Sequence, residues 1–192
     1  MNNKGINSAK IRGHIRNIKK NSRDTKMMLI DTNNGKDTTI KTLCKNELLA
    51  NIPRQSDVVI TGHVESIQIT AKGQSFYETF LYIEAISIQK SEAETVFGVK
   101  GNTHKKSCDY FIEGNVEQVI EDQDSLWLRI LVADDDGRKV NLSYNLRASK
   151  NVAKIKEGDR LCAVCSINGK KYNNTIKTDV VAKDIVIRKE NL

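Results

Sequence analysis

The chain contains the same order of segments twice, about 100 residues apart, and this repeat limits the folds that it can adopt. Residues 11–15 (IRGHI) return as residues 112–116 (IEGNV). Each copy continues with two apolar strands around a polar Gly turn, a helix-length stretch, and two further apolar runs around a Lys/Gly turn. These segments are residues 26–31, 33–35, 38–43, 47–52, 57–60, 72–73 and 81–88 in the first copy, and residues 126–133, 135–137, 139–144, 151–155, 159–162, 169–170 and 180–187 in the second. Because solenoid repeats are shorter, this period predicts two duplicated domains.

The length and composition fit two small globular domains. The chain has 192 residues, of which 39% are hydrophobic, and it contains a single proline. Two domains of roughly 90 residues lie within the usual size range, and each could have its own core. We therefore expect a first domain at residues 8–90, a linker at residues 91–107 and a second domain at residues 108–190.

The sequence lacks the usual signs of export or membrane insertion. No apolar run approaches the roughly 18 residues of a membrane span, and the polar, basic N-terminus does not resemble a secretion signal. The four cysteines (Cys44, Cys108, Cys162 and Cys165) stand at irregular positions that do not suggest a disulfide framework. These features predict a cytoplasmic protein without a membrane partner.

Positive charge is concentrated in the first copy. The whole chain has a formal net charge of +7. Residues 1–90 contain 14 Lys and Arg against 8 Asp and Glu, whereas residues 91–192 contain 17 against 16. This bias favours contact between the first domain and a polyanion. The alternative is that these Lys and Arg residues only solvate the surface.

The order strand, strand, strand, short helix, strand, strand is that of the OB-fold, a five-stranded Greek-key barrel. Gly13 and Gly114 fit a bend or bulge in a long first strand. We therefore expect an all-β chain of two tandem OB-fold five-stranded Greek-key barrels, each with a short helix between strands 3 and 4. Apolar and polar residues alternate along the strands; in residues 126–132 one face carries Leu126, Leu128, Ile130 and Val132, and the other carries Trp127, Arg129 and Leu131.

Over residues 8–188 the chain resembles a tandem pair of OB-folds. It is similar to single-stranded-DNA-binding proteins and to the paired OB modules of replication-protein-A-like assemblies. The likeness lies in the segment order and the turn positions. It implies a ligand site on the face of strands 2 and 3 and on the loops between strands 1 and 2 and strands 4 and 5. Such sites use cations that follow the phosphates and flat side chains on which bases stack.

Candidate nucleic-acid-binding residues occur at these places in both copies. In the first copy they are Lys19, Lys20, Arg23 and Lys26 around the loop between strands 1 and 2, which we expect at residues 19–24, Lys41 in strand 3, and Lys72, Phe76 and Tyr77 at the turn between strands 4 and 5. In the second copy they are Trp127 and Arg129 on strand 2, Arg138 and Lys139 after the acidic turn, and Lys170, Lys171 and Tyr172 at the turn between strands 4 and 5.

Trp127 is the strongest single candidate for base stacking. It lies on the polar side of an alternating strand, with Arg129 two residues further on. This arrangement suits stacking and cation–π contact, which contribute about 1–3 kcal/mol per stacked base. Alternatively, Trp127 caps the barrel or fills the interface between the domains. Strand-end packing is likewise an alternative to ligand contact for Phe76, Tyr77 and Tyr172.

The motifs that resemble catalytic or metal sites have simpler explanations. Residues 134–136 (DDD) could suggest a divalent-metal site, but residues 33–34 (NN) stand at the equivalent place before Gly35, and Asp or Asn before Gly favours a tight turn. Cys162 and Cys165 have the spacing of half a zinc knuckle, yet residues three apart on a strand point to opposite faces. The sequence contains no phosphate loop or dinucleotide fingerprint. We therefore expect no enzymatic activity, no metal and no cofactor.

These observations predict a non-enzymatic protein that binds single-stranded nucleic acid, DNA in preference to RNA, in DNA replication, recombination or repair. Because neither copy alone carries a complete set of candidate residues, the sequence fits a nucleic-acid strand that runs across both domains. Two alternatives remain open. One is an OB-fold protein-interaction subunit of a replication or mobile-element complex. The other is an RNA-binding factor that recognises the 2′-hydroxyl.

Overall fold

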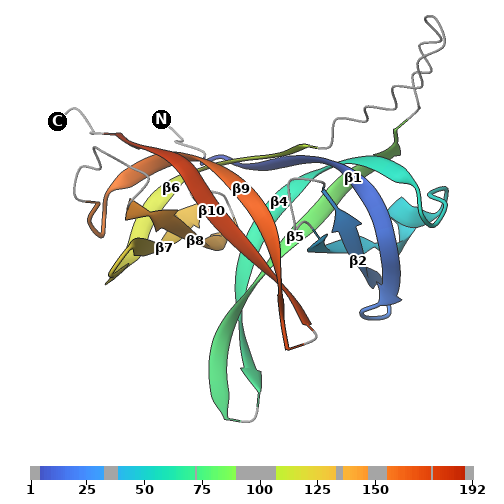
Figure 1. Cartoon of the computed structure of the whole chain (residues 1–192), viewed down its shortest axis with the longest axis horizontal. Helices are drawn as coiled ribbons and strands as arrows, with labels where there is room; N and C mark the ends of the chain where they lie inside the picture. Colours follow the sequence, from blue (N-terminus) through green and yellow to red (C-terminus); the bar gives the residue numbers. More distant parts are fainter. Residues whose placement is uncertain are drawn as a thin grey trace, which may run out of the picture.

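The computed structural model describes residues 5–32, 39–71, 73–89, 107–132, 136–146, 155–173 and 175–188, and almost all of them lie in β-strands (Figure 1). The strands of the first half are β1 (Asn7–Lys20), β2 (Thr25–Asp31), β3 (Thr39–Lys45), β4 (Asp57–Ala71) and β5 (Gln74–Ile88). Those of the second half are β6 (Ser107–Asp122), β7 (Ser125–Val132), β8 (Lys139–Asn145), β9 (Arg160–Tyr172) and β10 (Thr175–Arg188). The prediction of an all-β chain is confirmed.

Each half closes into a ring of five strands with the same pairing. In the first half, β1 pairs with β2 and β4, β2 with β3, β3 with β5, and β5 with β4. In the second half, β6, β7, β8, β10 and β9 repeat this cycle. The β3–β5 and β8–β10 pairs are parallel, and the other pairs are antiparallel. Closure pairs the strand edges within each ring, except that the first part of β1 also pairs outside its ring, with β6.

Glycine lets the first strand of each ring pass close to the second. A Cβ on Gly13 would lie 2.7 Å from the Asp31 carbonyl oxygen, and one on Gly114 would lie 2.4 Å from the Leu131 oxygen. The pairing register shifts shortly after each glycine, between Ile15 and Asn17 in β1 and between Val116 and Gln118 in β6. The predicted bulge is therefore present in both copies, and it follows the glycine rather than containing it.

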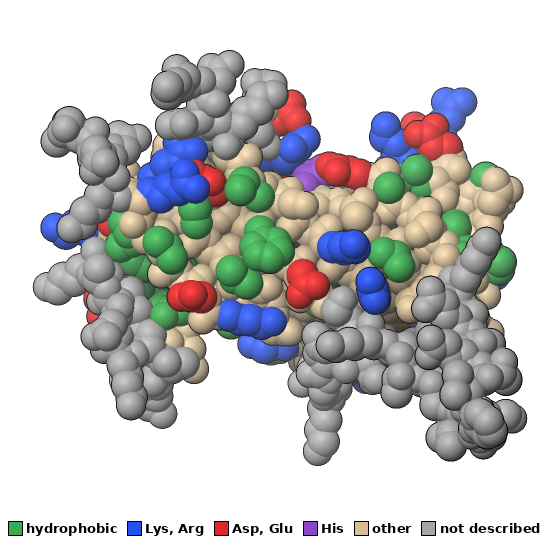
Figure 2. All heavy atoms as spheres, turned by 90° about the horizontal axis from the view of Figure 1, so that it is seen from above, with side chains coloured by type: hydrophobic (Ala, Val, Ile, Leu, Met, Phe, Trp, Pro, Cys, Tyr) green, Lys and Arg blue, Asp and Glu red, His purple; other side chains and the backbone are tan. Residues whose placement is uncertain are grey.

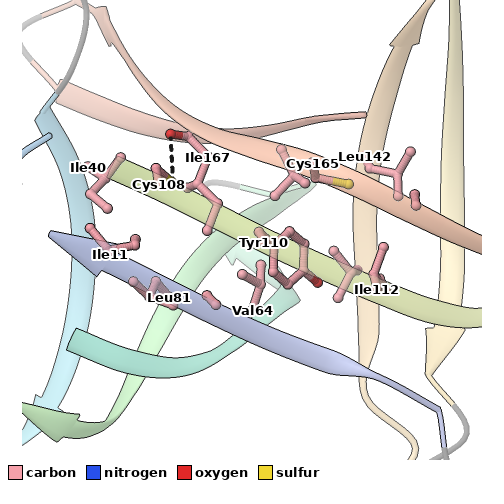
Figure 3. Close-up of a cluster of buried hydrophobic side chains, with 14 of the residues drawn as sticks. Ile11, Ile40, Val64, Leu81, Cys108, Tyr110, Ile112, Leu142, Cys165 and Ile167 are labelled. Carbon is pink, nitrogen blue, oxygen red and sulfur yellow. Dashed lines mark hydrogen bonds between the residues drawn. The ribbon is translucent and has the colours of Figure 1, made fainter. Parts of the chain in front are cut away.

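The two rings share one sheet and one core. β1 and β6 pair from Asn7 with Ile112 to Arg12 with Ser107, so that all ten strands belong to a continuous sheet. The buried side chains form a single cluster across both halves. Figure 3 shows the fully buried Tyr110 near Val64 of the first half and among residues of the second half. The sequence predicted a separate core for each domain, whereas the structure joins them, because the edges of β1 and β6 pair with each other.

Two predicted loop boundaries are wrong. Lys19 and Lys20 belong to β1, where they pair with Met27 and Lys26, and the loop between β1 and β2 begins after them. The turn predicted at residues 169–170 is also displaced, because β9 continues to Tyr172 and the turn begins at Asn173. The glycine at position 169 serves a close approach between strands instead of a turn, since a Cβ there would lie 1.6 Å from a backbone oxygen of β3.

Some predicted segments are reduced or lie outside the described residues. The short helix predicted at residues 47–52 is a single 3-10 turn, η1 (Asn46–Leu49), and most of its predicted counterpart, residues 151–154, lies outside the described residues. The same holds for the turn at residues 33–35, for residues 134–135 and for most of the linker. Among the described residues, no helix is long and apolar enough to cross a membrane.

Candidate functional site

Two long hairpins, β4–β5 and β9–β10, join the halves below β1 and β6 in the view of Figure 1. Each reaches the other half, because β4 contacts β8 while β9 and β10 contact β3. The backbone N–H of Asn141 donates to Ser66 Oγ (2.9 Å), and that of Lys41 donates to Thr178 Oγ1 (3.3 Å). Lys41 and Asn141 stand at equivalent positions of β3 and β8. The two halves therefore hold each other through a repeated, approximately symmetric contact.

A groove of about 920 Å³ lies between the tip of the β4–β5 hairpin, the outer face of β7 and the β9–β10 hairpin. We call it the inter-half groove. Both halves contribute to it, and it brings together six of the residues that the sequence singled out: Lys41, Phe76, Tyr77, Trp127, Arg129 and Tyr172.

Four aromatic side chains are accessible in this groove. Phe76 and Tyr77 of β5 are 42% and 43% exposed, Trp127 of β7 is 46% exposed, and Tyr172 of β9 is 61% exposed. The alternation predicted for β7 explains the position of Trp127, because its neighbours Leu126 and Leu128 are buried in the core. Large aromatic surfaces that remain open to solvent in a concave site can stack on a flat ligand.

The cations of the groove contact rings or carboxylates. The Arg129 guanidinium carbon lies 3.6 Å from the centroid of the Tyr77 ring. Lys41 Nζ pairs with Glu78 Oε1. Lys177 Nζ lies 5.1 Å from the Tyr172 ring centroid. Lys177 was missed in the sequence because it lies beyond the predicted turn, in a part of β10 with weak apolar alternation.

A separate hollow of about 290 Å³ at the end of the first ring collects four other predicted cations. We call its five positively charged residues the basic cluster: Lys19, Lys20, Arg23, Lys26 and Arg54. The other residues of this hollow, Ile18, Ser22 and Asn46, carry no charge. Sequence reasoning missed Arg54, because it lies some 30 positions away from the rest, between η1 and β4. Local positive potential of this kind attracts phosphate groups.

The remaining predicted residues do not line either site. Arg138 forms an ion pair with Asp136, Lys139 with Glu117 (2.8 Å) and Lys170 with Asp179 (3.0 Å). Lys171 is exposed near the end of β9, and Lys72 lies outside the described residues. On the face viewed in Figure 2, Lys and Arg side chains are interspersed with Asp and Glu side chains among hydrophobic ones. The basic cluster thus differs from this mixed face in having a lining of a single charge sign.

The cysteines lie in surroundings that suppress thiolate chemistry. Burial raises the pKa of Cys165 to about 12 and that of Cys44 to about 11. Both thiols are therefore protonated at neutral pH, and a protonated thiol is a poor nucleophile and metal ligand. Cys162 is partly exposed on the other face of β9 from Cys165, as the strand alternation predicted. Within the described ranges, no group of three His, Cys, Asp or Glu side chains is placed to hold a metal ion.

No protein-family model and no curated protein matches the sequence. Among solved structures, the chain matches the wild-type single-stranded DNA binding protein from Thermus aquaticus with a TM-score of 0.66 and 10% identity, over 98% of this chain and 96% of that chain. A deletion mutant of the same protein matches with a TM-score of 0.66 and 11% identity, over 98% and 97% of the two chains. The resemblance predicted from the segment order is confirmed for the fold, and the chain has an OB-fold architecture of this kind.

Proposed function

We propose that the chain is a tandem OB-fold protein that binds single-stranded nucleic acid, DNA in preference to RNA, in the inter-half groove. Each five-stranded ring is one barrel with a short helix between its third and fourth strands, and the domains are residues 8–90 and 108–190 with a linker at residues 91–107. The closed strand order supports this division. The likeness to the Thermus aquaticus single-stranded DNA binding protein supports single-stranded DNA as the ligand. The role that we propose for such binding is in DNA replication, recombination or repair.

The meeting of four exposed aromatic side chains in one groove carries this proposal. Bases that are not paired expose flat apolar faces, and stacking on aromatic side chains contributes about 1–3 kcal/mol per base. Trp127 and Tyr172 of the second half and Phe76 and Tyr77 of the first half line the same groove. A duplex keeps its bases stacked on one another, so this arrangement favours a single strand.

Cations that lie outside the set of stacking residues contact the phosphates of the bound strand. Lys171 is exposed near the end of β9, and the basic cluster offers five cations on the first ring. A strand that contacts both would cross from one half to the other. Because each neutralised phosphate releases counterions, affinity falls steeply as salt concentration rises. The protein acts in the cytoplasm by binding, without catalysis.

Fluorescence polarisation with a labelled oligonucleotide tests the proposal. At low salt we expect a Kd of about 1 μM or lower for single-stranded DNA, weaker binding at higher salt, and weaker binding of duplex DNA and of RNA with the same sequence. Trp127→Ala should weaken binding about tenfold, the equivalent of one lost stacking contact. Val186→Ala, at an exposed position of β10 outside the groove, is the matched control and should bind like the wild type. Absence of binding to any single strand at low salt would refute the proposal.

A protein-interaction module is the second candidate. Phe111 of β6 and Val164 of β9 are 48% and 40% exposed, and they are direct cross-strand neighbours. Exposed apolar pairs of this kind support a protein contact. Pull-down from lysate with nuclease treatment separates the candidates, because a protein partner that is retained after nuclease treatment and lost on Phe111→Ser substitution favours the interaction module.

A further inference from the structure

We propose that Arg129 is a positioning residue. Its guanidinium fastens the β4–β5 hairpin of the first half to β7 of the second half and so sets the width of the inter-half groove, instead of neutralising a phosphate. This inference rests on the proposed function for the role of the groove. The contact between the halves can be tested without any ligand.

The first contact of Arg129 holds the tip of the hairpin. The guanidinium carbon lies 3.6 Å from the centroid of the Tyr77 ring, which is the separation of two flat groups in direct stacking contact. Tyr77 is itself tied to its own hairpin, since its hydroxyl donates to Gln68 Oε1 of β4 (3.4 Å). Because Tyr77 is hydrogen-bonded within its hairpin, the contact with the guanidinium links Arg129 to both strands of the hairpin.

The second contact of Arg129 leads back to the same hairpin. Arg129 Nε donates to Asn141 Oδ1 on the neighbouring strand β8 (3.1 Å). The backbone N–H of Asn141 donates to Ser66 Oγ of β4 (2.9 Å), and Ser66 Oγ is hydrogen-bonded to Thr79 Oγ1 of β5 (2.8 Å). Both ends of this chain of contacts thus end on the β4–β5 hairpin. We call the set Tyr77, Arg129, Asn141, Ser66 and Thr79 the clasp.

The internal repeat shows that the fold does not require the clasp. Leu29 in β2 stands where Arg129 stands in β7, because Met28 and Leu128 pair with the equivalent residues of β3 and β8. Ile176 in β10 stands where Tyr77 stands in β5, by the equivalent pairing of β3 with β5 and of β8 with β10. The symmetric place thus holds two aliphatic side chains and cannot form this stack. The clasp is therefore an addition to the repeated fold, present at one of its two equivalent places.

In the clasp, the positive charge of Arg129 interacts with the Tyr77 ring and not with a phosphate of the ligand. One face of the Arg129 guanidinium covers the Tyr77 ring, and its Nε donates to the Asn141 side-chain amide. These two contacts hold the guanidinium in place before any ligand binds. A residue that neutralises a phosphate of a single strand contributes about 0.7 to the slope of log affinity against log salt concentration. A residue that acts by holding the hairpin contributes to affinity but not to this slope.

Affinity measured over a series of salt concentrations distinguishes the two roles. We expect Arg129→Gln to weaken oligonucleotide binding about fivefold, as the loss of one cation–π contact would do, with the salt slope unchanged. Tyr77→Leu should weaken binding at least as much, because it also removes a stacking surface, and it should leave the slope unchanged too. The double variant should bind no more weakly than Tyr77→Leu alone, because that variant already lacks the Arg129–Tyr77 contact. Arg129→Lys keeps the charge but not the flat donor group, so it should not restore affinity. Lys171→Gln removes the same charge at an exposed place and serves as the comparison for a reduced slope.

The fluorescence of Trp127, the single tryptophan of the chain, gives a readout that needs no ligand. Loosening of the hairpin should increase quenching of Trp127 by acrylamide in Arg129→Gln and Tyr77→Leu, while the circular dichroism spectrum and the Tm remain close to those of the wild type. Unchanged quenching in both variants would overturn the clasp, as would a slope reduced by about 0.7 together with wild-type affinity of Arg129→Lys. If the wild-type protein binds no oligonucleotide, the proposed function fails and the quenching experiment still decides the clasp.

Discussion

Gly169 stands where β9 of the second half crosses β3 of the first half. A Cβ at this position would lie 1.6 Å from the Thr39 carbonyl oxygen, a distance that no side chain can occupy. The equivalent crossing in the other direction is made by Ser66 of β4 against β8, where the side chain serves as a hydrogen-bond acceptor. The two crossings therefore follow the same path with different residues, and only one of them demands glycine.

We predict that Gly169→Ala destabilises the protein by about 1–3 kcal/mol, because β9 must move away from the backbone of β3. The free energy of unfolding from urea titration measures this loss. Lys170→Ala is the matched control in the same strand. It removes an exposed ion pair with Asp179, which contributes less than about 1 kcal/mol. Equal stability of the two variants would show that β9 can shift without cost.

Single residues were predicted well where alternation decided their side, and poorly where contact between distant segments decided their role. The exposed position of Trp127 follows from the alternation along β7. The stacking of Arg129 on Tyr77 does not, because the two residues come from different halves. Glycine is ambiguous for the same reason. It serves turns with positive φ, as Gly73 does, and close approaches, as Gly169 does, and the sequence does not separate the two uses.

Among the strands, their order and pairing partners were predictable, and their lengths were not. The fourth strand of each copy was expected at residues 57–60 and 159–162, yet β4 extends to Ala71 and β9 to Tyr172. The distal parts of these strands leave their own ring and carry polar residues such as Gln68 and Thr70. These distal parts are held in β-structure by pairing within the hairpin and by contacts with the other half. Period-2 patterning within one segment encodes neither of these interactions. The inter-half groove is built from these same extensions.

The difference between β2 and β7 predicts how many nucleic-acid strands each protein chain binds in the inter-half groove. Met27 and Leu29 of β2 occupy the places that Trp127 and Arg129 occupy in β7. A base gains far more from an aromatic platform than from these aliphatic side chains. We therefore expect one short oligonucleotide per chain in calorimetric titration. Met27→Ala should leave the affinity unchanged, in contrast to Trp127→Ala. Two equivalent sites per chain would contradict the asymmetry between the halves.

For the whole molecule, the pairing of β1 with β6 decides how the two halves behave. The sequence predicted the duplication but not this pairing, because the edges of strands carry no distinctive side-chain pattern. Tyr110 shows its effect most directly. The ring is fully buried within the shared core, and its hydroxyl donates to Asn7 Oδ1 of the first half (3.0 Å). Asn7 in turn donates to the Val64 carbonyl oxygen (2.8 Å), so a residue of the second half supports the first half from within.

A shared core predicts that both halves unfold together. If one half unfolded alone, Tyr110 and the apolar surface around it would be exposed to water. This exposure would destabilise the half that was still folded. Trp127 fluorescence reports β7 of the second half and the groove around it, whereas far-UV circular dichroism reports the strands of both halves. We expect the two signals to give one coincident transition in urea. Tyr110→Ala should separate them, because it removes the side chain that spans the boundary and leaves a cavity there, at a cost of about 3–5 kcal/mol. Separate transitions in the wild-type protein would mean that the continuous core does not couple the halves, and that the β1–β6 pairing only aligns two halves that fold independently.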